Sequence, residues 1–153
     1  MKKIFQLLII IISFYFPNIE AYAHSKEKLL LITGCGRSGT MYIAEVLQKC
    51  KVDVKHEEMG MDGISSWCCV VTDPRVPAGE PRGGFFFKHI FHQVRNPLKV
   101  ISSVHASFKP SSWDFILKHV PEIRRADSKI VKSAKYWYYW NLKAEAIAEW
   151  RRS

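Results

Sequence analysis

The sequence contains few cysteines, and none of them is placed for a common cysteine-based site. Of the four, no two form a CxxC pair, and none stands at a convincing zinc-ligand spacing from a histidine. We therefore expect no metal site. Cys68 and Cys69 are adjacent in an apolar stretch, which is typical of small core residues. In an exported chain Cys50 or Cys68 can also form a disulfide, but the spacing assigns no partner.

Acidic residues are scarce, and internal repeats and low-complexity tracts are absent. Asp and Glu number 14 against 23 Lys and Arg, so that the formal net charge is +9. This excess suits an anionic ligand, such as a nucleotide phosphate or an acidic glycan, and is equally compatible with a generically basic protein. The length of 153 residues, with 48% hydrophobic and 24% charged residues, predicts one globular domain rather than a disordered chain.

The longest apolar run is shorter than the roughly 20 residues of a membrane-spanning helix. This run, residues 4–16, follows two lysines and precedes a small-x-small cleavage sequence at 21–23. The layout predicts that residues 1–23 are a secretory signal peptide or, alternatively, an uncleaved membrane anchor. We expect the chain to be exported or anchored, to meet the membrane only through these residues, and to fold as an α/β domain over 24–153.

The first part of this domain reads as strand, turn, helix and strand. The continuous apolar run at 28–33 predicts a strand buried on both faces, and a glycine-rich turn follows at 34–39. Apolar residues at helical spacing predict a helix at 40–49, and alternation at 51–55 predicts a second strand. A parallel α/β sheet begins in this order.

The second part begins with a loop at 57–84, because proline and glycine cluster between 74 and 84, with a short helix or strand within 64–71. After this loop, the sequence predicts β-structure at 85–87, a strand at 90–94 and helices at 98–107, around 113–117 and at 130–150.

The last of these helices contains a cluster of aromatic residues at 136–140. These residues are expected to pack against the sheet rather than to stack on nucleic-acid bases, so we expect no nucleic-acid partner.

The predicted fold class is α/β, a three-layer P-loop-like domain with a central parallel sheet. The sheet is expected to have roughly three or four strands. The strands near 29–33, 51–55 and 90–94 are expected to be adjacent, with the glycine-rich turn at 34–39 and Arg95 at their carboxyl ends.

The glycine-rich turn carries the first candidate site. A loop of this kind points several backbone N–H groups at one place, and the dipole of the following helix adds partial positive charge there. The sequence therefore predicts a phosphate site. The loop reads Gly34-Cys35-Gly36-Arg37-Ser38-Gly39-Thr40.

Two common nucleotide motifs overlap this loop. A Walker A loop needs lysine after its second glycine, where the chain has Thr40, so an ordinary ATPase or kinase is not expected. The dinucleotide fingerprint Gly-x-Gly-x-x-Gly is met by Gly34, Gly36 and Gly39, and Glu57 or Glu58 follows near the position of the ribose-binding acid. A Rossmann-type dinucleotide-binding domain is therefore one alternative.

A third interpretation accounts for two segments at once. The stretch from Ile32 to Thr40 resembles the 5′-phosphosulfate loop of sulfotransferases, in which lysine or arginine precedes Ser-Gly-Thr. The stretch from Val94 to Ser103, which begins Val-Arg-Asn-Pro, resembles the 3′-phosphate segment of that family. The resemblance is good over residues 29–56 and 89–108.

This resemblance implies a sulfuryl donor, 3′-phosphoadenosine 5′-phosphosulfate, and assigns roles to single residues. The Arg37 cation would lie against the 5′-phosphate and the bridging oxygen, while Arg95 and Ser103 would bind the 3′-phosphate. ATP and NAD carry no 3′-phosphate, so this second segment distinguishes the donor from both. The other residues of the 5′-phosphate site would be Gly34, Gly36, Ser38, Gly39 and Thr40.

Sulfuryl transfer needs a neutralised leaving phosphate and an acceptor hydroxyl that is aligned and loses its proton. Arg37 is the candidate for the first task. His56 and Glu57, directly after the second predicted strand, are the favoured candidates for the catalytic base, with Glu58 and His92 as alternatives. The chemistry requires no metal. The expected acceptor bears a hydroxyl, and a glycan is among the options.

Two departures from the resemblance bear on activity. Sulfotransferases continue to a glycine- and lysine-containing loop that closes over the nucleotide, whereas this chain ends at Ser153 without one. The domain is therefore expected to be incomplete at its C-terminus, and a shortened, inactive copy of the enzyme is one alternative. An export signal would also separate the enzyme from a cytosolic donor. A nonenzymatic module that binds a nucleotide or another anion is the second alternative.

Overall fold

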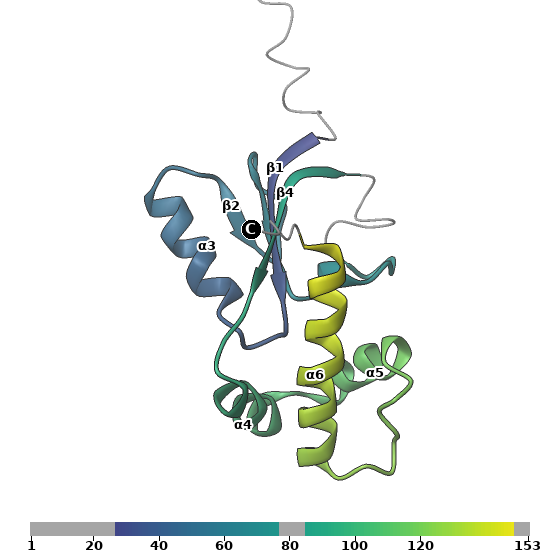
Figure 1. The fold of residues 1–153 in the computed structure, drawn as a ribbon. Helices are drawn as coiled ribbons and strands as arrows, with labels where there is room; N and C mark the ends of the chain where they lie inside the picture. The colour runs from purple at the N-terminus through teal and green to yellow at the C-terminus, as the bar shows by residue number, and fades with distance from the viewer. Residues whose placement is uncertain (1–26, 77–84, 149–153) are drawn as a thin grey trace, which may run out of the picture.

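A four-stranded parallel sheet forms the centre of the domain (Figure 1). The computed structural model describes residues 27–76 and 85–148, so the predicted signal or anchor at 1–23 lies outside the described residues. The order of the strands across the sheet is β2-β3-β1-β4. Their bounds are β1 (Glu27–Gly34), β2 (Val54–His56), β3 (Gly63–Ser65) and β4 (Phe86–Gln93).

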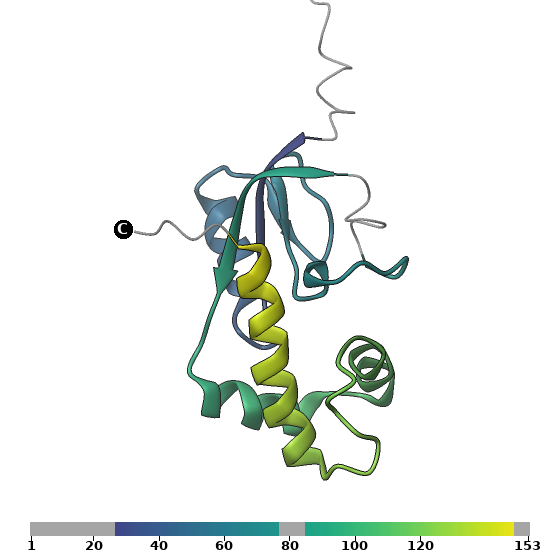
Figure 2. The ribbon, with the colours of Figure 1, turned by 45° about the vertical axis from the view of Figure 1, so that its right-hand side comes forward.

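Helices pack on both sides of this sheet, which confirms the predicted α/β fold with a central parallel sheet. Helix α3 (Thr40–Lys49) lies on one side and α6 (Lys129–Ile147) on the other (Figure 1). Helices α4 (Pro97–Ser107) and α5 (Pro110–His119) gather beyond the end toward which the strands point (Figure 2). Within the described ranges, no helix is long and apolar enough to cross a membrane.

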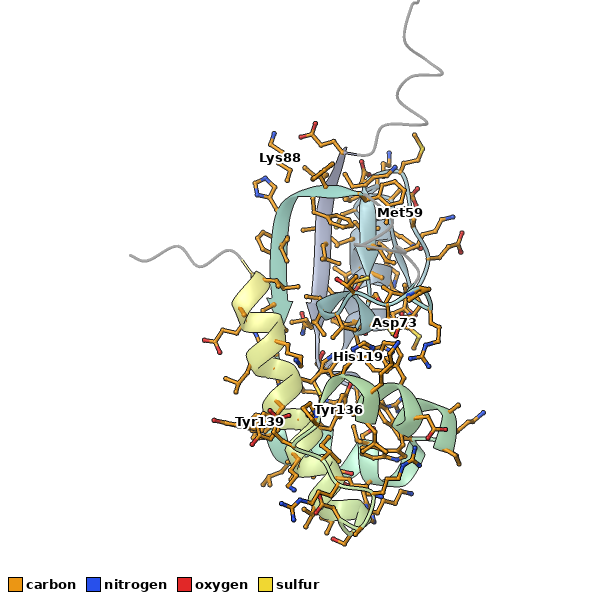
Figure 3. The ribbon with its side chains drawn as sticks, turned by 90° about the vertical axis from the view of Figure 1, so that its right-hand side faces the viewer. Met59, Asp73, Lys88, His119, Tyr136 and Tyr139 are labelled. Carbon is orange, nitrogen blue, oxygen red and sulfur yellow. The ribbon has the colours of Figure 1, made fainter. Side chains whose placement is uncertain are left out.

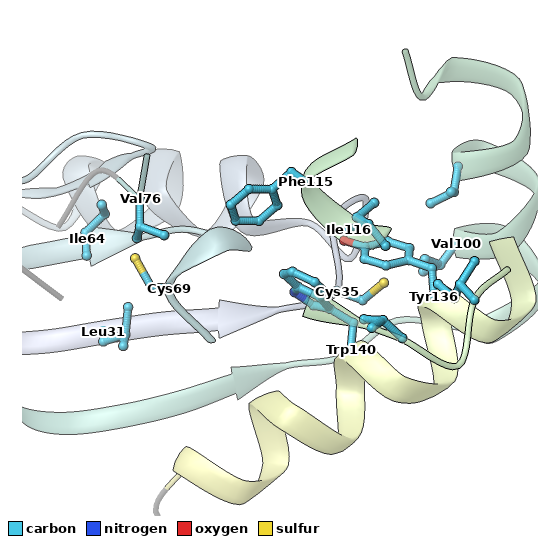
Figure 4. Close-up of a cluster of buried hydrophobic side chains, with 13 residues drawn as sticks. Leu31, Cys35, Ile64, Cys69, Val76, Val100, Phe115, Ile116, Tyr136 and Trp140 are labelled. Atoms are coloured by element: carbon cyan, nitrogen blue, oxygen red, sulfur yellow. The ribbon is translucent and has the colours of Figure 1, made fainter. Parts of the chain in front are cut away.

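The middle of strand β1 is apolar, and its residues from Leu30 to Ile32 are buried on alternating faces of the sheet. Leu30 and Ile32 pack in a small cluster on the side of α3. Leu31 belongs to a larger cluster on the opposite side, together with Tyr136 and Trp140 of α6 (Figure 4). Both aromatic side chains are fully buried, which confirms that the aromatic helix packs against the sheet.

One expectation about the order of the strands is wrong. The strands predicted near 29–33 and 90–94 are neighbours, but β3 separates β1 from β2. This strand comes from the segment 57–84 and has three residues, which are too few to show a periodic pattern. Gly63 permits its close pairing, because a Cβ there would overlap the backbone carbonyl of Leu30.

A buried carboxylate ties α5 to the segment that follows the 3₁₀ helix η1 (Cys68–Val70). Asp73 is 1% exposed, and it contacts Arg75 Nε at 2.8 Å, Lys118 Nζ at 2.7 Å and His119 Nε2 at 2.9 Å (Figure 3). Hydrogen bonds from Arg75 and Lys118 hold the pKa of the Asp73 carboxyl well below its ordinary range. The carboxylate therefore stays charged and fixes the position of α5.

The four cysteines are free thiols, so the disulfide considered for Cys50 or Cys68 is not formed in this structure. Burial raises the pKa of the Cys35 and Cys68 thiols above its ordinary value. Both groups are therefore protonated at neutral pH. Cys69 is fully buried, as expected for a small core residue, whereas its neighbour Cys68 is only partly buried. Cys35 is also fully buried.

Candidate functional site

The loop between β1 and α3 lies at the carboxyl end of the sheet, and two of its glycines permit close packing there. A Cβ at Gly34 would overlap the backbone carbonyl of Gln93, the last residue of β4. A Cβ at Gly36 would lie 2.9 Å from the Tyr136 hydroxyl and 3.0 Å from the Phe108 ring. Any larger residue at either position would push the loop away from its neighbours.

The backbone of the loop is shaped to present N–H groups. Arg37 and Gly39 have left-handed conformations, with φ values of 73° and 108°. Left-handed residues among right-handed ones turn N–H groups toward a common concave side, which is the geometry of an anion-binding nest. Helix α3 begins at Thr40, and the first N–H groups of a helix have no acceptor within it. The loop and the helix start thus offer several donors near the positive end of the helix dipole.

Side chains at the end of β4 hold the carbonyl groups of the loop. Gln93 Nε2 donates to the Ser38 carbonyl at 3.4 Å, and Arg95 Nη1 donates to the Arg37 carbonyl at 3.2 Å. The C=O and the next N–H of a trans peptide point in opposite directions, so the Gly39 N–H is turned away from Gln93. The Ser38 hydroxyl is buried and has no hydrogen-bond partner among residues 27–76 and 85–148. An unpaired buried hydroxyl is costly, so a ligand oxygen would suit it.

The structure brings the two sequence motifs together at this end of the sheet. Arg37 Nε donates to Ser103 Oγ of α4 at 2.8 Å, and Arg95 contacts the loop backbone as described above. Helix α4 starts at Pro97 and is capped by the side chain of Asn96, as the Arg-Asn-Pro sequence indicates. Arg37, Arg95 and Ser103 therefore share one side of the domain.

Arg37 and Arg95 carry charges that the described residues do not neutralise. In the part of the chain that the structure describes, no Asp or Glu forms an ion pair with Arg37 or Arg95. Two guanidinium groups beside backbone donors create a positive potential that attracts anions. Because they lie on different elements, they can contact two separate negative groups of one ligand.

A cavity of about 360 Å³ opens beside the loop. Arginine side chains and loop backbone form one part of its lining, and the aromatic rings of Trp67 and Phe108 form another. This combination fits a ligand that has both anionic groups and a carbon skeleton. No group of three potential metal ligands occurs among the described residues. The lining residues are Gly36, Arg37, Gly39, Thr40, Met41, Tyr42, His56, Trp67, Arg95, Phe108 and Ser112.

His56 is the candidate base that lines this cavity. It ends β2, its side chain is 33% exposed, and its Nε2 lies 3.3 Å from Thr40 Oγ1 at the start of α3. Ser65 of β3 donates to the Thr40 carbonyl at 2.7 Å. The two short strands therefore fix the histidine and the helix start relative to each other.

Glu57, the other favoured candidate for the base, does not line the cavity. Its carboxylate accepts hydrogen bonds from Ser66 Oγ at 2.7 Å and from the Trp67 N–H at 3.3 Å. It also lies 3.5 Å from His56 Nε2. The carboxylate can therefore hold the His56 ring in place. Glu57 therefore reaches the cavity only through its contact with His56.

The two alternative bases also lie away from the cavity lining. Glu58 forms an exposed ion pair with Lys55 at 2.9 Å. His92 Nε2 lies 2.9 Å from Asn141 Oδ1, on the side of the sheet that α6 covers. Of the candidate bases, only His56 therefore reaches the cavity.

Tyr136 is a site residue that the sequence analysis missed. It is fully buried, and its hydroxyl accepts a hydrogen bond from the Gly36 N–H at 2.8 Å across 100 sequence positions. Burial raises the pKa of Tyr136 well above its ordinary value, so the phenol stays neutral. The aromatic cluster at 136–140 indicated a core helix, but nothing in its spacing shows which ring carries a hydroxyl to the loop.

We expect Tyr136→Phe to lower the free energy of unfolding by about 1–3 kcal/mol, because the buried Gly36 N–H loses its acceptor. Urea denaturation measures this difference. Tyr138→Phe is the matched control, since Tyr138 lies on the same helix and is 51% exposed. Its effect should stay within about 0.5 kcal/mol. Equal effects of the two substitutions would contradict the role given to the Tyr136 hydroxyl.

Comparisons with known proteins add no family assignment to this geometry. No protein-family model matches the chain, and neither a curated protein nor a solved structure matches it. The chemistry of the site therefore has to be argued from the residues of this chain alone.

Proposed function

We propose that the chain is a sulfotransferase-like protein that transfers a sulfuryl group from 3′-phosphoadenosine 5′-phosphosulfate to a hydroxyl acceptor. The observation that carries the proposal is the meeting of the Gly34–Thr40 loop with Arg95 and Ser103. The loop suits one phosphate, and the cation at the end of β4 suits a second one. The proposed donor carries phosphate at both its 5′ and 3′ positions.

In the proposed reaction, the acceptor oxygen attacks the donor sulfur as its proton passes to the imidazole of His56. The bond between sulfur and the bridging oxygen breaks, and the 3′,5′-bisphosphate leaves with both electrons of that bond. Arg37 and the loop N–H groups neutralise the charge that develops on the leaving phosphate. Glu57 acts as a positioning residue, because its carboxylate lies 3.5 Å from His56 Nε2 and holds the ring in place. The proton on His56 returns to solvent after release of the products.

The Rossmann-type alternative has less support. A Rossmann-type domain binds the ribose of its cofactor through an acidic residue that follows the second strand, so this residue must not be occupied by other hydrogen-bond or ion-pair partners. The Glu57 carboxylate instead accepts hydrogen bonds from Ser66 and Trp67, and Glu58 pairs with Lys55. In addition, β1 and β2 are not neighbours in this sheet.

Transfer from a labelled donor tests the proposal and separates it from a nonenzymatic binding module. The full chain is incubated with ³⁵S-labelled donor and a panel of phenols, sugars and peptides, and released bisphosphate is quantified. We expect acceptor-dependent release, and a loss of about two to three orders of magnitude in Arg37→Ala. Binding of the bisphosphate without any transfer would favour the binding module. Tighter binding of NAD than of the bisphosphate would favour the dinucleotide alternative.

A further inference from the structure

Another cavity, of about 440 Å³, adjoins the cavity beside the phosphate loop. The two cavities share Phe108 in their linings. Helix α5 also contributes to both, because Ser112 lines the first and Trp113 lines the second. A chain-like ligand could therefore occupy both cavities by passing over Phe108.

The lining of the second cavity is strongly cationic. It includes Arg125, Lys129 and Lys132, against a single carboxylate, Asp114. Asp114 lies 3.7 Å from Arg125, and both side chains are largely exposed, so this ion pair is weak. No Asp or Glu in the described ranges pairs with Lys129 or Lys132. The cavity therefore has an excess of two positive charges, which favours an acidic ligand.

Lysines close to this cavity have carboxylate partners, unlike those that line it. Lys118 pairs with Asp73 at 2.7 Å, and Lys135 pairs with Asp127 at 2.7 Å. The charges of Lys118 and Lys135 are therefore neutralised, whereas those of Lys129 and Lys132 are available to a ligand.

An aromatic surface lies among these cations. The indole of Trp113 is half-buried and packs edge-on against Phe108, with 5.9 Å between the ring centroids. An aromatic ring beside cations suits a ligand that has an apolar flat face and an acidic substituent. A uronic acid has both, since its ring carries axial C–H groups and a carboxylate.

We propose that the acceptor is an acidic glycan, of which one uronic acid residue binds at Trp113, Lys129 and Lys132 while a neighbouring sugar presents its hydroxyl to His56. This inference rests on the proposed sulfuryl transfer, because that reaction requires a hydroxyl acceptor. A glycan fits better than an acidic peptide, since each of its sugars offers hydroxyl groups. Its carboxylates also recur at a fixed spacing, so that one anchored residue can place the next sugar.

Calorimetry on the full chain tests this inference with a hyaluronan hexasaccharide and a neutral chitin hexasaccharide of the same length. We expect the acidic hexasaccharide to bind at least about tenfold more tightly than the neutral one. The double variant Lys129→Gln/Lys132→Gln should remove this difference. The matched control is Lys49→Gln/Lys88→Gln, which removes the same charge at exposed positions outside both cavities and should keep the difference.

The adenosine 3′,5′-bisphosphate is titrated into the same proteins, so that this inference and the proposed function can fail separately. Bisphosphate binding without any preference for the acidic hexasaccharide would overturn the glycan proposal alone. A lysine-dependent preference without bisphosphate binding would support the glycan site and contradict the sulfotransferase proposal. Tighter binding of hexaglutamate than of the acidic hexasaccharide would assign the cavity to an acidic peptide and overturn the glycan proposal.

Discussion

Replacing His56 by alanine is expected to slow sulfuryl transfer by about two to four orders of magnitude. In the structure, His56 is the only candidate base that lines the cavity beside the phosphate loop. Without its imidazole, the acceptor hydroxyl would have to lose its proton to water in the transition state. The rate of bisphosphate release under saturating donor and acceptor measures the loss.

A second histidine provides the control for this experiment. His105→Ala removes an imidazole from the exposed end of α4, away from the cavity lining, and should leave the rate unchanged. His56→Ala should still bind the bisphosphate, since the loop donors and both arginines remain. Glu57→Gln should cause a smaller loss than His56→Ala, because Glu57 acts through His56. An unchanged rate in His56→Ala would remove His56 from the mechanism.

The parts of the site that the sequence predicted are those encoded by short local segments. The Gly34–Thr40 loop joins an apolar strand to a helix within a few residues, and Asn96-Pro97 contains the signals that begin α4. Both are local properties of the chain. Because parallel strands end at the same edge of a sheet, the proximity of Arg37 and Arg95 also followed from the predicted fold.

The parts that the sequence did not predict depend on contacts between distant segments. The position of β3 between β1 and β2 depends on Gly63 fitting against the Leu30 backbone. The hydrogen bond from Gly36 to Tyr136 spans 100 positions, and the orientation of Glu57 depends on Ser66 and Trp67. No periodicity or motif encodes such contacts, so local patterns could not assign these roles.

The second large effect that we expect is a strong preference of the protein for a nucleotide that carries a 3′-phosphate over one that lacks it. The loop, with its N–H groups and the Arg37 cation, is sufficient for a 5′-phosphate. Arg95 and Ser103 would serve a second phosphate, and a hydrogen bond to a charged group contributes about 1.5–3 kcal/mol. Adenosine 3′,5′-bisphosphate should therefore bind roughly tenfold to a hundredfold more tightly than adenosine 5′-monophosphate.

Arg95→Ala should remove most of this preference, because it deletes the cation assigned to the 3′-phosphate. The affinity for the 5′-monophosphate should change by less than about threefold, provided that the loop keeps its conformation without the bond to the Arg37 carbonyl. Arg124→Ala is the control, since it removes an exposed arginine outside the cavity lining and should leave both affinities unchanged. An equal loss of affinity for both nucleotides in Arg95→Ala would show that Arg95 supports the loop rather than a second phosphate.

The most direct test of a site for two phosphates is a calorimetric comparison of the two nucleotides on the unmodified chain. The proposal predicts that the 3′,5′-bisphosphate binds at least about tenfold more tightly than the 5′-monophosphate. Equal affinity for the two nucleotides would contradict the assignment of Arg95 and Ser103 to a 3′-phosphate, and with it the sulfotransferase-like function.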